Sequence, residues 1–175
     1  MLEQIARVAE CSKASLYRRY SSKAALFKAV VAARGRHLLE EARAVEASSR
    51  NPLLATKEIA QFFLDFMLRP ETVEAYRIVI ADGHRIPSVV DDMMATSVEP
   101  FVATIGRLLK AAADAGHIES TDHEETTRVL MGLVLGWPLQ NTLLGQNKLL
   151  DPQARHRFFE RAWQIFLSGI RRAAP

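Results

Sequence analysis

Apolar residues recur at three- and four-residue spacings along most of the chain, a pattern that predicts amphipathic helices. The first two apolar stripes are short and only a few residues apart. They consist of Ile5, Ala6 and Ala9, and then of Leu16 and Tyr20. Two short helices joined by a tight turn indicate a helix-turn-helix motif, in which the second helix enters the major groove of DNA.

The polar face of the second short helix agrees with a DNA partner. Ser12 and Ser22 stand directly before the second and third helices, where a hydroxyl can accept a hydrogen bond from a free backbone N–H group. Cations and hydroxyl groups, which suit phosphates and base edges, dominate the outward positions. These positions are Lys13, Ala14, Ser15, Tyr17, Arg18 and Arg19.

Longer helices follow, and no stretch alternates with the period of two that is typical of a strand. The spacing and the Pro and Gly breaks predict helices over 23–48, 53–68, 72–84, 87–95, 98–115, 122–145 and 152–172. We therefore expect an all-α protein with a helix-turn-helix DNA-binding domain at 1–46. A larger helical bundle at 47–175 would serve ligand binding and dimerisation.

The helix over 23–48 would join these two domains. Its inner stripe is expected to contain Leu26, Phe27, Val30, Val31, Leu38 and Leu39. The residues expected on its outer face are Arg34, Arg36, Glu40 and Glu41.

Positive charge is concentrated at the start of the chain. Residues 1–36 contain eight Lys or Arg and two acids, a balance of +6, whereas the whole chain carries +3. Charge gathered at one end indicates a polyanionic partner. A solvated basic face on an ordinary helical bundle is the alternative.

The N-terminal spacings resemble those of the tetracycline-repressor-like (TetR/AcrR-type) transcriptional regulators. The matching positions are Ile5-Ala6, Ala9, Ser12-Lys13, Leu16-Tyr17, Tyr20, Ser22-Lys23, Ala25-Leu26 and Val30. The resemblance implies a small DNA-binding domain and a larger domain that binds an inducer and dimerises. Carried over by position, it implies phosphate contacts by Ser15, Tyr17, Arg19 and Lys23, and base-edge contacts by Lys13, Ala14 and Tyr17. Arg18 is a further candidate.

The sequence departs from this family at three points. Glu10 occupies the turn where Gly is usual, so we expect either a remodelled turn or a modest strain. Cys11 replaces a common Val and is expected to be a small core residue, with a redox-sensing thiol as the alternative. The helix that family members carry before this motif is not in the sequence, which leaves open a helical ligand- or protein-binding dimer that no longer binds DNA.

The composition agrees with a soluble cytoplasmic protein. A chain of 175 residues with 49% hydrophobic residues can bury a core, and its one cysteine excludes an internal disulfide framework. The longest apolar run, 129–139, is shorter than the ~20 residues of a membrane span. We expect no membrane association.

The last two helices predict a homodimer, because both are apolar on more than one face. The candidate interface residues are Leu133, Trp137, Phe159, Trp163, Phe166 and Ile170. Gly132 and Gly136, four residues apart, would permit helices to approach closely, and packing within a single chain explains this glycine pair equally well. A two-fold dimer would require a roughly palindromic operator.

The middle helices supply apolar and aromatic residues for a small-molecule inducer site. The candidates are Phe62, Phe66, Tyr76, Ile80, Met94 and Phe101, each of which could also be plain core. Possible polar groups of the pocket are Tyr76, Asp82, His84, Arg85 and Gln140. The segment from Arg69-Pro70-Glu71-Thr72 through Tyr76 to Ala81 and Pro87 resembles the AefR-like C-terminal domains of the same family.

An enzyme is not expected. The five histidines form no HExxH motif or close pair, and there is no Gly-rich phosphate loop. We therefore expect no cofactor, no metal and no catalytic residues. The partners predicted are double-stranded DNA, a small inducer and a second copy of the chain, and a repressor released by an apolar or amphipathic ligand is the function favoured.

Overall fold

The computed structural model describes Arg7, Glu10 and residues 12–83, 87–119, 122–146 and 148–170. All regular structure in these residues is helical, which confirms the predicted fold class. The elements are α2 (Lys13–Arg19), α3 (Lys23–Ser48), α4 (Pro52–Met67), α5 (Pro70–Asp82), α6 (Pro87–Met93), the π-helical η2 (Met94–Val98), α7 (Glu99–Asp114), α8 (His123–Leu143) and α9 (Pro152–Ile170).

The helices begin where side chains can cap them. The Ser12 hydroxyl accepts a hydrogen bond from the Ser15 N–H at 3.0 Å, and the Ser22 hydroxyl accepts from the Ala25 N–H at 3.1 Å, as predicted. Asn51 caps α4 and Asp122 caps α8 in the same way. Each cap satisfies donors that have no partner within the helix, so each fixes the residue at which the helix starts.

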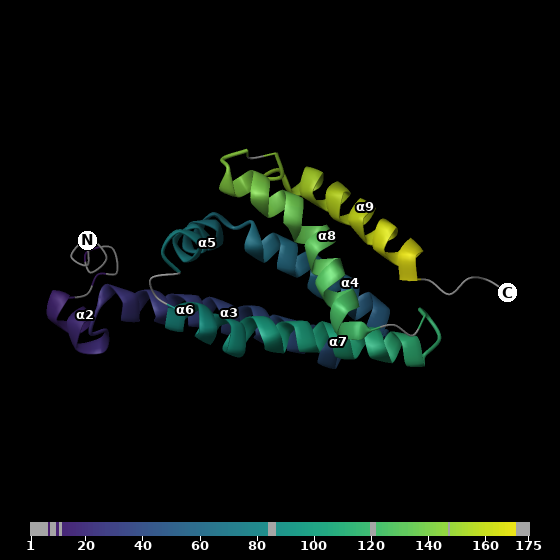
Figure 1. Ribbon diagram of the computed structural model, residues 1–175, viewed down its shortest axis with the longest axis horizontal. Helices are drawn as coiled ribbons and strands as arrows, with labels where there is room; N and C mark the ends of the chain where they lie inside the picture. The colour runs from purple at the N-terminus through teal and green to yellow at the C-terminus, as the bar shows by residue number, and fades with distance from the viewer. Residues whose placement is uncertain are drawn as a thin grey trace.

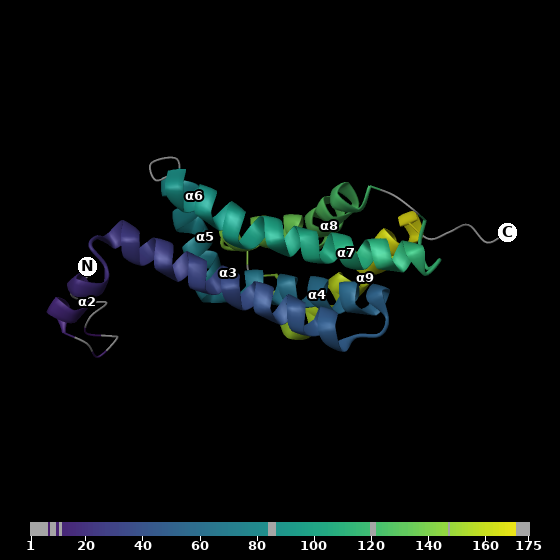
Figure 2. The same cartoon turned by 90° about the horizontal axis from the view of Figure 1, so that it is seen from below.

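Two long, adjacent helical stretches, α3 and α7, run along the length of the molecule (Figure 1). Helix α4 packs on both of them, and α8 and α9 cover this layer, as the view from below confirms (Figure 2). Helix α2 lies at the N-terminal end of α3, far from α9 in both views. The core therefore lies between α3, α4, α7, α8 and α9, and α2 projects from one end.

Sequence spacing missed the continuity of the helical run from Pro87 to Asp114. We predicted separate helices over 87–95 and 98–115, whereas η2 connects α6 directly to α7. Helix α3 approaches η2 so closely that a Cβ atom added to Gly35 would lie 1.9 Å from Ser97 Oγ. The π-helical turn therefore occurs where two segments far apart in the sequence meet, which local spacing does not reveal.

The face of α3 that packs inward differs from the prediction at two positions. Leu38 and Leu39 are buried as expected, but Val30 is 43% exposed. Arg34, expected on the outer face, has a side chain that is only 26% exposed. Arg34 is directed toward α5, where it contacts Thr72 and Glu71, whereas Val30 faces solvent.

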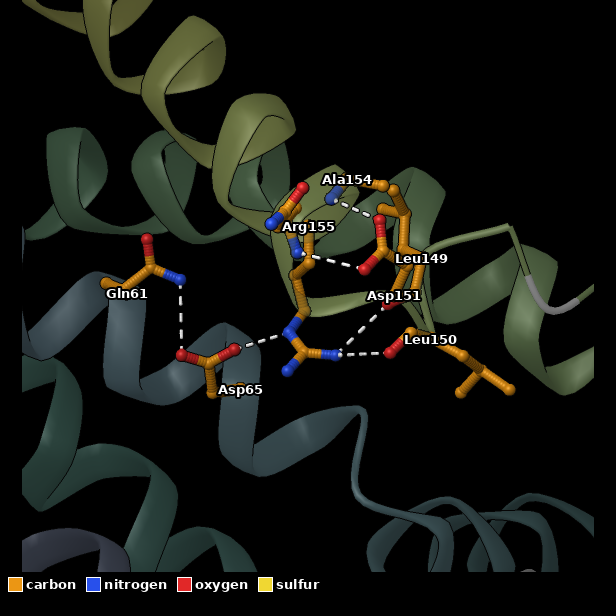
Figure 3. A network of polar contacts seen from close by, with 8 residues as sticks. Gln61, Asp65, Leu149, Leu150, Asp151, Ala154 and Arg155 are labelled. Atoms are coloured by element: carbon orange, nitrogen blue, oxygen red, sulfur yellow. Dashed lines mark hydrogen bonds and ion pairs between the residues drawn. The ribbon is translucent and has the colours of Figure 1, made fainter.

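Polar contacts tie α9 to α4 at the start of α9 (Figure 3). The Arg155 guanidinium donates to the Asp65 carboxylate and, at 3.1 Å, to the Leu149 carbonyl. Gln61 Nε2 donates to the other Asp65 oxygen at 3.2 Å. This network holds the loop before α9 and the body of α4 in one arrangement.

A search of the described helices finds none that combines the length and the apolar character of a membrane span.

Candidate functional site

The outward face of α2 presents cations and hydroxyl groups to solvent. Tyr17, Arg18 and Arg19 are exposed, and so is Lys23 at the first position of α3. Their side chains form no ion pair or hydrogen bond with other described residues, although the Arg19 guanidinium lies 6.0 Å from the Tyr20 ring centroid. These cations are therefore available to a ligand outside the chain.

Two further predicted DNA-contact residues are exposed or partly exposed on α2, and one lies outside the described part. Ala14 is exposed, and Ser15 is half-buried and accepts a hydrogen bond from the Ser12 hydroxyl at 2.9 Å. Lys13 begins α2, but its side chain is outside the described residues, as is Cys11. The structure thus brings Ala14, Ser15 and the exposed cations to one end of the molecule.

The turn before α2 is tight and strained. Glu10 has φ = 49°, in the left-handed region that favours glycine, and its N–H donates to the Arg7 carbonyl at 3.2 Å. A side chain in this conformation costs about 1–2 kcal/mol. The strain expected from Glu10 is therefore present, and it occurs directly before the exposed helix.

A cavity of about 280 Å³ lies in the bundle between α3, α4, α5, η2, α7 and α8. Most of its wall is apolar. Four of the six residues predicted for ligand binding line it, namely Phe66, Tyr76, Met94 and Phe101. Its volume is close to the lower end of the range for small-molecule sites, and a mostly apolar lining is typical of them.

The other two predicted ligand residues do not line this cavity. Ile80 is 59% exposed on the outside of α5. Phe62 lies on the next face of α4, with its ring centroid 6.1 Å from that of Phe66 and 5.9 Å from the Arg69 guanidinium. The helical spacing selected the right helices but could not tell which side of each helix faces the cavity.

Few polar groups face the cavity, and the most notable was not among our candidates. Arg34 lines it together with Tyr76, Thr72 and Ser97. Of the other polar groups proposed, Gln140 is exposed and outside the lining, while His84, Arg85 and the side chain of Asp82 lie outside the described residues. A signal for Arg34 existed, because it shares the helical face of Val31 and Leu38.

Arg34 makes several contacts at the edge of the cavity. Its Nη2 donates to Thr72 Oγ1 at 2.5 Å and lies 3.4 Å from Glu71 Oε1, and its guanidinium carbon lies 5.4 Å from the Phe66 ring centroid. Its Nε is buried and has no hydrogen-bond partner in the part of the chain that the structure describes. A backbone hydrogen bond, with help from Arg34 and Arg69, lowers the pKa of the Glu71 carboxyl, so this group is ionised at neutral pH.

The residues predicted for a dimer interface fall into two groups. Phe159, Trp163 and Phe166 are buried inside the single chain, so their side chains are not available to a partner. Leu133 and Ile170 are partly buried against the same core, and Trp137 is 46% exposed while its ring stacks on Phe158. The three buried aromatic residues therefore belong to the core of the single chain and not to the predicted subunit interface.

Other apolar side chains of α8, α9 and the loop between them face solvent in the single chain. They are Val129, Trp137, Leu144, Leu150 and Ile165. No atom lies within 4 Å of a Cβ added to Gly132 or Gly136, so this side of α8 is open. Among the described residues, no group of three or more His, Cys, Asp or Glu side chains is placed to hold a metal ion.

Two family models match the chain. Residues 55–169 match the C-terminal domain of AefR-like transcriptional repressors, and residues 1–30 match the bacterial regulatory proteins of the tetR family. No protein with a curated function matches the sequence.

Solved structures share the fold at low sequence identity. A protein from Mesorhizobium loti MAFF303099 described as a TetR-family transcriptional regulator superposes with a TM-score of 0.85 at 18% identity, over 98% of this chain and 87% of the other. The flavonoid-responsive regulator FrrA superposes with a TM-score of 0.66 at 23% identity, over 98% of this chain and 87% of FrrA. A TetR-family regulator from Pseudomonas syringae pv. tomato str. DC3000 gives 0.63 at 19%, over 99% and 87%.

Proposed function

The chain belongs to the TetR family of bacterial transcriptional regulators, with an AefR-like C-terminal domain, and we propose that it is a homodimeric cytoplasmic repressor released from DNA by a small ligand. The family is regulatory rather than enzymatic. In this proposal residues 1–46 bind a roughly palindromic operator, and residues 47–175 bind the ligand and the second subunit.

The observation that carries the proposal is the set of unpaired side chains at the exposed end of the molecule. Arg18, Arg19 and Lys23 have no ion-pair or hydrogen-bond partner among the described residues, and Tyr17 is exposed on the same helix as the two arginines. A polyanion would supply the missing counter-charges and release bound counterions from the DNA. We assign phosphate contacts to Ser15, Tyr17, Arg19 and Lys23, and base-edge contacts to Lys13, Ala14 and Tyr17.

The ligand acts through α3, which runs without a break from Lys23 at the DNA-binding end to the cavity wall at Val31, Arg34 and Leu38. A molecule in the cavity can release DNA only if it binds more tightly to a conformation in which the two copies of α2, one from each subunit, have a spacing that does not fit the operator. The apolar lining supports an apolar or amphipathic ligand.

DNA binding is tested by fluorescence anisotropy with DNA flanking the gene, at several salt concentrations. Arg19→Ala and Lys23→Ala should each weaken binding to all sequences and reduce the salt slope by roughly one to two phosphates per dimer. Lys148→Ala, which removes an exposed lysine from the loop before α9, is the matched control and should leave both unchanged. No selective binding by a folded dimer would instead favour a helical ligand- or protein-binding dimer.

Dimerisation is assigned to the open side of α8 and α9. Trp137→Glu places a charge among the exposed apolar residues there and should shift the molecular mass measured by light scattering toward the monomer. Leu54→Glu changes an equally exposed apolar residue on α4 and should leave the mass unchanged. Loss of the dimer in both variants, or in neither, would contradict this assignment.

A further inference from the structure

We propose that the cavity binds an anionic ligand, an apolar molecule with a single carboxylate, and that Arg34 is the residue that recognises the carboxylate. The inference rests on the proposed function, since it names the class of small molecule that would occupy the regulatory cavity. It is carried by Arg34, a charged residue in a mostly apolar wall, whose buried Nε has no hydrogen-bond partner among the described residues.

Among the described residues that line the cavity, Arg34 alone carries a permanent charge. Its hydrogen-bonding groups are only partly satisfied by the described residues, because Nη2 contacts Thr72 and Glu71 while Nε has no acceptor among them. A buried donor without a hydrogen-bond partner lowers the stability of the protein, and this free-energy cost is greater for a charged group. Arg34, a residue of the cavity wall, therefore carries a charged donor for which the described residues supply no acceptor.

A carboxylate suits the Arg34 guanidinium better than a neutral acceptor does. The guanidinium donors form a planar fork whose geometry matches the two oxygens of a carboxylate, and Nε is one of those donors. Tyr76 also lines the cavity, and its hydroxyl makes no hydrogen bond with any described residue. It supplies a second donor for the same ligand.

The surrounding charges favour an anion as well. Two guanidinium groups, those of Arg34 and Arg69, lie 5.4 Å and 5.5 Å from the Phe66 ring centroid. Glu71 is the carboxylate that neutralises one of them, but its side chain is 59% exposed and lies 3.4 Å from Arg34. A ligand carboxylate in a drier position would compete well with this solvated one for the same guanidinium.

The cavity volume limits the apolar part of the ligand. A volume of about 280 Å³ equals roughly nine water molecules at their density in the liquid. This suits a bicyclic aromatic ring or a medium-length alkyl chain, with the rings of Phe66 and Phe101 in the wall to contact it. We therefore chose 2-naphthoate and its uncharged isostere 2-naphthamide as probes.

The test is isothermal titration calorimetry, which measures the affinity of the full chain for each probe at neutral pH. The charge-assisted contact predicts that 2-naphthoate binds at least about tenfold more tightly than 2-naphthamide. Arg34→Gln should remove this preference and leave 2-naphthamide binding unchanged. Arg69→Gln, which removes the other guanidinium from the same Phe66 ring without changing a lining residue, is the matched control and should retain the preference.

Glu71→Gln provides a readout that a purely structural role for Arg34 would not give. It removes the competing carboxylate, so 2-naphthoate binding should become severalfold tighter. Equal binding of the two probes to the unmodified chain, or no binding of either, would overturn the proposal without any variant having to fold. DNA binding and its release are measured separately, so release by 2-naphthamide with equal potency would refute the anion preference and leave the regulator function standing.

Discussion

Replacing Gly35 by alanine should destabilise the protein, even though alanine is the better helix former. Gly35 lies in the interior of α3, where the exchange by itself would contribute about 0.8–1.0 kcal/mol of stability. The added Cβ would, however, lie 1.9 Å from Ser97 Oγ and 2.5 Å from Ser97 Cβ. Rotation of the Ser97 side chain moves Oγ but not Cβ, so η2 or α3 must shift.

Overpacking of this kind costs about 1–3 kcal/mol, so subtracting the gain in helix propensity leaves a net loss of about 0–2 kcal/mol. Contacts of 1.9 Å and 2.5 Å place Gly35→Ala in the upper part of this range. Gly106→Ala is the matched control in the interior of α7. A Cβ there would meet its nearest atom at 3.7 Å, an ordinary contact, so this variant should gain up to about 1 kcal/mol.

Urea unfolding followed by circular dichroism measures both effects, with the protomer concentration held constant because the unit is proposed to be a dimer. Ser97→Gly removes both atoms that the new Cβ would meet. The double variant Gly35→Ala/Ser97→Gly should therefore have a free energy of unfolding at least about 1 kcal/mol higher than the sum of the two single changes predicts. A Gly35→Ala protein as stable as the unmodified chain, or a double variant with no recovery, would refute the close approach of α3 to η2.

Three further predictions concern the core, the α4–α9 network and the start of α8. Phe101→Ala should lower the free energy of unfolding by about 3–5 kcal/mol, because the ring is 1% exposed, and a loss under 1 kcal/mol in urea would contradict its burial. Arg155→Ala should cost roughly 1–3 kcal/mol by leaving the Asp65 carboxylate without its main partner, whereas an unchanged unfolding midpoint would show that the network contributes nothing. Hydrogen bonds from the Glu125 and Glu124 N–H groups lower the pKa of the Asp122 carboxyl. The carboxylate therefore contributes fully to the stability of the folded protein above the ordinary pKa of 3.8, and this contribution is lost as the pH falls through the lowered pKa. Asp122→Ala should therefore lower Tm at pH 7 but much less at pH 2, and a Tm difference that does not depend on pH would contradict this linkage.

Local sequence rules were sufficient for most of the fold. Ser22 and Asn51 cap helices by chemistry that is complete within a few residues. The predicted start at 23 is the observed one, and the predicted start at 53 is one residue later than Pro52, where α4 begins. The unpaired cations of α2 could be anticipated for the same reason, since their exposure follows from one short amphipathic helix.

The misses required information from distant segments. The π-helical turn at η2 depends on the approach of Gly35, more than fifty residues earlier, and Arg34 was assigned to the outer face because its charge was given more weight than its spacing. Phe159 and Trp163 were assigned to a subunit interface because helical periodicity shows that a face is buried but not what covers it. In each case the deciding contact is tertiary.

The unbroken course of α3 makes it a rigid arm that can amplify a small displacement. At 1.5 Å per residue, the distance from Arg34 to Lys23 is about 16 Å along the axis. A tilt of about 6° around Arg34 would therefore move the start of α3, and the recognition helix joined to it, by about 1.7 Å. In a two-fold dimer the N-terminal ends of the two α3 helices would move in opposite directions, which changes the spacing of the two recognition helices by about 3 Å. A displacement smaller than a bond length at the cavity would thus be enough to put the two recognition helices out of register with the two half-sites of the operator.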